Sequence, residues 1–152
     1  MKLQDLRTEI ETDPKGLGYA GKTPDQVLAL LTAKSRTRLR VLGSAELVAW
    51  AAANGRLASI KDASTNSAFP GSVRSIALAA TMLLERDGTT LDLNLQSRRD
   101  LVAGLVQANV LTQADSEDLY ASATENITRL EETGIGEMHL GDVLWAMHQL
   151  PE

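Results

Sequence analysis

The sequence predicts a mainly α-helical fold: a single compact helical domain over residues 1–152, with six or seven helices and at most a small two- or three-stranded β element. Apolar residues recur at spacings of three and four along most of the chain, and helix start and stop signals bracket these stretches. Only three short segments alternate with a period of two. A chain of 152 residues without cysteine is also long enough to bury a core without disulfides.

The first predicted helix carries an apolar stripe of Leu3, Leu6 and Ile10. It is expected to end at Asp13-Pro14, because the residue before a proline is disfavoured in the α region. A second helix is expected to start at Thr23-Pro24, where threonine caps the helix and proline occupies its first turn.

Between these helices lies a glycine-rich stretch that starts with KGLGYAG. Gly16, Gly18 and Gly21 permit a backbone with positive φ, so this stretch is predicted to be an ordered corner with at least one left-handed glycine. Tyr19 is expected to attach the corner to the core.

Four cations, Lys34, Arg36, Arg38 and Arg40, occupy alternate positions in the next segment. The period of two predicts an extended segment with one charged face, here called the basic strip. Two interpretations are nearly equal: a solvated strand edge that discourages aggregation, and a docking surface for an acidic neighbour. Nucleic acid is a weaker third partner, since no aromatic residues are interleaved to stack on bases.

The remaining segments follow the same two periodicities. Further helices are predicted at residues 44–54, 70–86, 97–109, 112–134 and 142–150, with short extended pieces at 91–95 and 138–140 and a polar loop containing at most a turn of helix at 56–69.

Composition and charge exclude several classes of function. The absence of cysteine rules out thiolate zinc sites and cysteine nucleophiles, and a net charge of −5 argues against a dedicated nucleic-acid-binding protein. No apolar run reaches membrane-spanning length, and the charged N-terminus MKLQDLRTEIETD lacks the apolar segment of a signal peptide. These features predict a soluble intracellular product.

The candidate chemical groups are better explained by structural roles. His139, Asp142 and His148 do not share a helical face at metal-binding spacing, and Asp142 is expected to serve the start of the last helix. Glu9, Glu11 and Asp13 are predicted to lie on solvated sides of the first helix. No catalytic residue, metal site, cofactor or small-molecule substrate is therefore predicted.

Two stretches carry a resemblance to a family. The run LRTEIETDPKGLGYAGKTPDQVLALLTAKSRTR resembles the opening of a family of small tailed-bacteriophage structural or virion-associated proteins, which share an EI-x-x-DP…GYAG motif. The stretches LDLNLQSRRDLVAGLVQANVLTQAD and RLEETGIGEMHLGDVLWA are similar to its later parts. The resemblance is most specific at residues 9–38 and 129–146, and Leu31-Thr32 stands where many relatives have Leu-Asn.

The resemblance implies a non-enzymatic structural protein of a tailed-phage particle, located in the neck, the tail or with the capsid. Such a protein would occur in the virion, and in the host cytoplasm during assembly, and would bind copies of itself and other virion proteins. The expected interaction residues are Lys34, Arg36, Arg38, Arg40 and Tyr19, facing acidic groups of a neighbour at residues 9–13 or 115–118. The alternative is a small phage-encoded regulator that binds nucleic acid through the basic strip.

Overall fold

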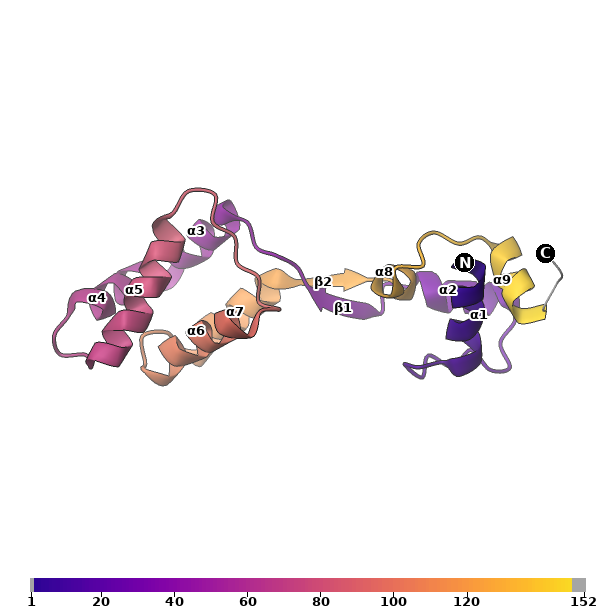
Figure 1. Cartoon of the computed structure of the whole chain (residues 1–152), viewed down its shortest axis with the longest axis horizontal. Helices are drawn as coiled ribbons and strands as arrows, with labels where there is room; N and C mark the ends of the chain where they lie inside the picture. The colour runs from indigo at the N-terminus through magenta and orange to yellow at the C-terminus, as the bar shows by residue number, and fades with distance from the viewer. Residues whose placement is uncertain (1, 149–152) are drawn as a thin grey trace. The chain divides into compact units, whose positions relative to one another are not determined.

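The structure, a computed structural model, describes residues 2–148. These residues are mainly helical and contain one small antiparallel sheet of two strands, which confirms the predicted fold class (Figure 1). The elements in chain order are α1 (Lys2–Thr12), α2 (Pro24–Thr32), β1 (Arg36–Leu39), α3 (Ser44–Ala52), the 3₁₀ turn η1 (Ala53–Gly55), α4 (Arg56–Thr65), α5 (Gly71–Glu85), α6 (Gln96–Gln107), α7 (Gln113–Ala123), β2 (Thr124–Ile127), α8 (Arg129–Thr133) and α9 (Leu140–His148).

Contacts group the chain into two compact units, whereas the sequence predicted one domain over residues 1–152. Unit 1 consists of Met1–Arg38 and Asn126–Glu152, and unit 2 consists of Leu39–Glu125. Each unit has its own hydrophobic cluster. Periodicity identifies which face of a helix is apolar, but it does not reveal which faces pack together, so the division into two cores was not visible in the sequence.

Unit 1 joins the two ends of the described chain. Helix α9 packs against both α1 and α2, and α2 also contacts α8. Its buried hydrophobic residues are Leu6, Tyr19, Val27, Leu31, Leu130, Ile135, Met138, Val143 and Ala146. The apolar stripes predicted for the first two helices and the last one therefore meet in a single core.

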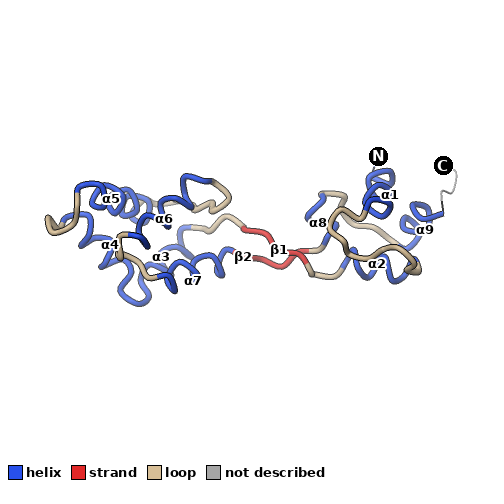
Figure 2. The backbone as a smooth tube through the Cα atoms, turned by 90° about the horizontal axis from the view of Figure 1, so that it is seen from below, coloured by secondary structure: helices blue, strands red, loops and turns tan. Residues whose placement is uncertain are grey.

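The corner between α1 and α2 is ordered as predicted. The Asp13 carboxylate accepts hydrogen bonds from the backbone N–H groups of Leu17, at 2.7 Å, and Gly18, at 2.9 Å. All three predicted glycines have positive φ, with values of 65°, 85° and 74° at Gly16, Gly18 and Gly21. Figure 2 shows this loop as the segment that precedes α2.

Unit 2 is a bundle of the central helices. Helix α4 lies along α5, α3 contacts both of them, and α6 packs between α5 and α7. Its largest fully buried hydrophobic side chains are Leu42, Ile60, Leu93 and Leu119. Leu42 and Leu91 form an isolated antiparallel bridge near the start of the unit.

The predicted helix at 112–134 is wrong, because it is two helices separated by a strand. Helix α7 ends at Ala123, residues Thr124–Ile127 pair with β1, and Thr128 caps α8 by accepting a hydrogen bond from the Glu131 N–H at 3.1 Å. Pairing with β1 overrides the local helical periodicity across this stretch. Strand β1 lies within the basic strip and so confirms the extended form predicted for it. Figures 1 and 2 both draw the two strands side by side.

The structure also differs from the prediction at the other two extended pieces and at the loop of residues 56–69. Residues 91–95 contribute only the Leu91 bridge before a turn in which the Asp92 side chain accepts from the Asn94 N–H at 2.9 Å. At the third predicted piece, Leu140 is already the first residue of α9. Residues Arg56–Thr65 form α4, so the described part of the chain has more helical segments than the six or seven predicted.

Replacing Gly18 by alanine is expected to destabilise the protein by about 1 kcal/mol, because a residue with a Cβ is strained in the left-handed region. An added Cβ at Gly18 would meet nothing within 4 Å, so the cost comes from the backbone and not from a clash. Gly141→Ala is the matched control: its Cβ also meets nothing, its φ is not positive, and it lies in α9. Gly141→Ala is expected to melt at or slightly above the parent, because alanine is favoured over glycine within a helix. A melting temperature of Gly18→Ala equal to that of the parent would contradict the prediction.

Candidate protein-interaction site

The four cations of the basic strip differ in how exposed they are. Lys34 is exposed and precedes β1, and Arg38 is exposed within β1. Arg36 and Arg40 are half-buried, and each is held by a carboxylate of its own unit. The sequence predicted one charged face, and the structure pairs two of its cations internally: Arg36 with Glu132, 96 residues later, and Arg40 with Glu46, six residues later.

Arg36 binds Glu132 of α8 through two hydrogen bonds. Its Nε and Nη2 atoms lie 2.8 Å and 3.2 Å from the two carboxylate oxygens. The hydrogen bonds from Arg36, followed by one from Arg129, lower the pKa of Glu132 to about 2. Bidentate pairs of this kind have fixed geometry as well as charge complementarity.

Arg40 is held within unit 2 in a similar way. Its Nη1 and Nη2 atoms donate to Glu46 at 2.9 Å and 2.6 Å, and Nη2 also donates to the Ser122 carbonyl at 2.9 Å. Hydrogen bonds from Arg40, and then from the Gly43 N–H, lower the pKa of Glu46 to about 2. Glu46 thus links Arg40 to the start of α3.

The most buried polar cluster of unit 1 connects α1, the glycine corner and α8. Arg129 is 6% exposed and donates from Nε and Nη2 to the two oxygens of Glu9, at 2.7 Å and 2.9 Å. The Tyr19 hydroxyl donates to the same Glu9 carboxylate at 3.1 Å, and Arg129 Nη1 donates to Glu132 at 2.7 Å. We call Glu9, Tyr19, Arg129, Glu132 and Arg36 the unit 1 network.

This network corrects two sequence-based expectations. Glu9 is 5% exposed and is not solvated, and Tyr19, at 2% exposed, does not present its ring to a partner. Tyr19 does attach the corner to the core, as expected. Burial among carbon atoms, together with the Glu9 carboxylate, raises the pKa of Tyr19. Glu9 follows the buried Leu6 by three residues, so the two lie on the same side of the helix. This spacing was the sequence signal that Glu9 lies beside the apolar stripe.

In the second acidic region proposed as a partner surface, Asp115 and Asp118 are paired inside unit 2, although the Asp118 side chain is 57% exposed. Arg56 is 4% exposed, and it pairs with Asp115 and Asp118 of α7 at 2.8 Å and 2.9 Å. The same guanidinium donates to the Trp50 carbonyl at 3.0 Å and lies 5.0 Å from the centre of the Trp50 ring. Sequence reasoning did not single out Arg56, because its segment had no clear helical stripe.

Exposed aliphatic side chains are concentrated in unit 2. Those that are about half exposed or more are Val41 (48%), Val48 (53%), Leu78 (51%), Met82 (64%) and Leu95 (51%), all between residues 39 and 125. Leu78 and Met82 lie one turn apart on α5, and the exposed small residues Ser75 and Ala79 lie on the same side. We call these four residues the α5 face.

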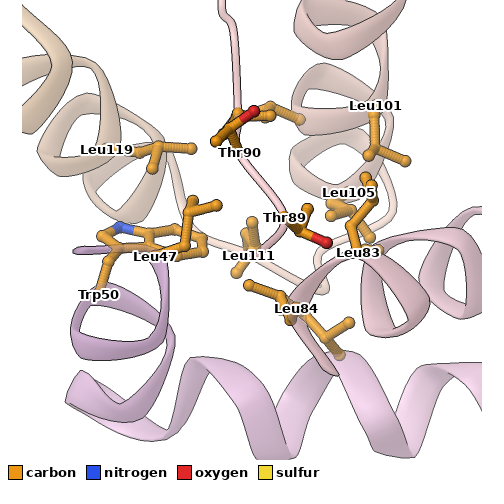
Figure 3. A pocket seen from close by; sticks show the side chains of 14 residues that line it. Leu47, Trp50, Leu83, Leu84, Thr89, Thr90, Leu101, Leu105, Leu111 and Leu119 are labelled. Atoms are coloured by element: carbon orange, nitrogen blue, oxygen red, sulfur yellow. The ribbon is translucent and has the colours of Figure 1, made fainter. Parts of the chain in front are cut away.

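A small cavity lies inside unit 2. It has a volume of about 40 Å³ and almost entirely apolar walls, contributed by every helix of the unit and the connection after α5 (Figure 3). Its lining residues include Leu47, Trp50, Ala80, Leu105, Leu111 and Thr89. The Thr89 hydroxyl oxygen is buried and has no hydrogen-bond partner among the described residues.

The candidate metal ligands occupy ordinary structural positions. The His139 N–H donates to the Asp142 carboxylate at 2.7 Å, so Asp142 serves the start of α9 as predicted. Within residues 2–148 no group of three or more histidine or acidic side chains is arranged to hold a metal ion. Among the helices described there, none combines the length and apolar character that crossing a bilayer requires.

Arg129→Ala is expected to destabilise the protein by about 3–5 kcal/mol, because it leaves the buried Glu9 carboxylate without a countercharge. The double variant Glu9→Leu, Arg129→Met should cost clearly less, since neither charge then remains buried. Urea unfolding measures the loss of stability in both variants. Arg86→Ala, at an exposed position, is the control and should change the free energy of unfolding by less than about 0.5 kcal/mol. A loss no larger for Arg129→Ala than for Arg86→Ala would contradict the role assigned to the network.

The lowered pKa of Glu132 predicts a specific dependence of stability on pH. Its folded-state pKa is about 2 against an ordinary 4.5, so its contribution is fully present well above pH 4.5 and is lost as the pH falls toward 2. The difference in unfolding free energy between the parent and Glu132→Gln should therefore shrink over that range. A difference that stays constant between pH 6 and pH 2 would refute the prediction.

Comparisons of the chain with protein-family models, with curated protein sequences and with solved structures found no match. The resemblance to tailed-phage proteins therefore remains a hypothesis.

Proposed function

We propose that the protein is a non-enzymatic structural component of a tailed-phage particle, which acts through protein–protein contacts in a symmetric assembly. The observation that carries this proposal is the concentration of exposed aliphatic side chains in unit 2. The motif resemblance at residues 9–38 and 129–146 supplies the phage context.

The α5 face has the properties of a helix-packing surface. Leu78 and Met82 are large and exposed, while Ser75 and Ala79 beside them are small enough for another helix to approach closely. Arg74 and Glu85, both exposed, lie near the two ends of the stripe and can form a polar rim. Exposed apolar surface of this kind, rimmed by polar groups, is typical of protein-interaction sites.

The charged groups favour this surface over the basic strip as the main source of affinity. Arg36 and Arg40 already bind Glu132 and Glu46, so a neighbour's carboxylates would have to displace bidentate internal pairs.

The same pairs weaken the alternative of a nucleic-acid-binding regulator. Phosphate groups would have to compete with Glu132 for Arg36 and with Glu46 for Arg40. A protein that relies on a few exposed cations while carrying a net charge of −5 is expected to bind nucleic acid weakly. The structural role is therefore the preferred proposal.

The double variant Leu78→Gln, Met82→Gln is expected to fold like the parent but to lose self-association and incorporation into particles. Leu140→Gln is the matched control, since it makes the same change at the 37%-exposed leucine of unit 1. Sedimentation velocity over a range of protein concentrations measures association, and circular dichroism checks the fold. Association that survives in the double variant, or that is lost equally in the control, would contradict the proposal.

A further inference from the structure

We propose that Asn54 is a site of spontaneous deamidation, and that its isoaspartyl product loosens the turn that positions Arg56 in unit 2. This inference goes beyond the proposed structural role, and it does not depend on it. It rests on the sequence Asn54-Gly55, on the left-handed turn that these two residues form, and on the buried arginine that follows them.

Asn54 and Gly55 are the two central residues of a tight turn between α3 and α4. Both are exposed and left-handed, with φ values of 55° and 69°, and the Arg56 N–H donates across them to the Ala53 carbonyl. Two consecutive left-handed residues closed by such a hydrogen bond form a type I′ turn, for which Asn-Gly is a preferred sequence. The turn therefore favours a dipeptide whose side chain and backbone can react with each other.

The reaction joins the Asn54 side chain to the next peptide nitrogen. The Gly55 nitrogen loses its proton and attacks the side-chain carbonyl carbon of Asn54, so a new C–N bond forms. The bond from that carbon to the side-chain nitrogen breaks, and this nitrogen takes up a proton from water and leaves as ammonia. Water then opens the resulting succinimide at either carbonyl, which gives aspartate or isoaspartate. Glycine has no Cβ to hinder ring closure, and the exposure of both residues admits water.

Asn109 provides an internal comparison. It is also exposed and left-handed, with a φ of 58°, but the residue that follows it is Val110. Valine is branched at Cβ, and Val110 is buried at 7% exposed, so its backbone nitrogen is hindered from attacking. In the whole sequence, Asn54 is the one asparagine that glycine follows. The expected difference in rate therefore comes from the following residue and not from the exposure of the asparagine.

Isoaspartate at position 54 changes the turn itself. Its main chain runs through the former side chain, which adds one atom between Ala53 and Arg56 and alters the span that their hydrogen bond closes. Arg56 is 4% exposed, and its side chain donates to Asp115 at 2.8 Å and to the Trp50 carbonyl at 3.0 Å. A displaced backbone at the start of α4 weakens these contacts, so the isoaspartyl form is expected to be less stable than the parent.

Incubation of the full chain at pH 6 and at pH 8, followed by peptide mapping with mass spectrometry, tests the site. The peptide that contains Asn54 is expected to gain the mass difference between an amide and a carboxylic acid. The gain should be faster at pH 8, because the attacking nitrogen must lose a proton. Protein isoaspartyl methyltransferase should label this peptide, whereas the peptide that contains Asn109 should keep its amide over the same period. Asn54→Gly permits the same left-handed turn without the amide, and it should acquire no label.

The stability of the product tests the link to Arg56. After chromatographic separation, the isoaspartyl form should unfold at a lower urea concentration than the parent. Asn54→Asp is the matched control: it carries the same new charge on an ordinary backbone, and it should unfold close to the parent. The proposal is overturned if Asn54 keeps its amide, if Asn109 converts as fast, or if aspartate is the sole product. An isoaspartyl form that unfolds like the parent refutes the effect on Arg56.

Discussion

The ion pair between Arg129 and Glu9 is the interaction on which unit 1 depends. It joins residues 120 positions apart, and both side chains are buried. Tyr19 attaches the glycine corner to the same carboxylate, and Glu132 extends the cluster to Arg36 in β1. A buried pair adds little net stability compared with apolar residues, but its geometry must be satisfied completely, so it specifies how the two ends of the chain combine.

The network also gives a physical meaning to the motif that produced the phage resemblance. Glu9, Tyr19 and Arg129 all lie within the two most specific stretches, 9–38 and 129–146, and both stretches belong to unit 1. Asp13 and the three left-handed glycines build the corner that presents Tyr19 to Glu9. The motif is therefore explained by folding, and the exposed aliphatic residues on which the proposed function rests lie in the other unit.

Local features were predictable from the sequence, and long-range pairings were not. The caps at Thr23 and Asp142, the left-handed glycines and the extended form of the basic strip follow from nearby residues. The end of α7 at Ala123 depends on pairing with a strand more than 80 residues earlier, and the inward orientation of Arg36 depends on Glu132. Leu78 and Met82 could have been noticed as apolar residues outside the buried stripe of α5, but their exposure required the packing of the other helices.

The central claim is that unit 2 associates through the α5 face while the internal ion pairs keep Arg36 and Arg40 occupied. Because the chain has no cysteine, a single nitroxide label can be placed at position 82 through Met82→Cys, and at position 34 through Lys34→Cys in a separate sample. Electron paramagnetic resonance then measures how accessible each label is to a water-soluble relaxation agent, in dilute and in concentrated protein. The account predicts that the label at position 82 becomes protected on association while the label at position 34 stays accessible. Protection at position 34 with unchanged access at position 82 would contradict it.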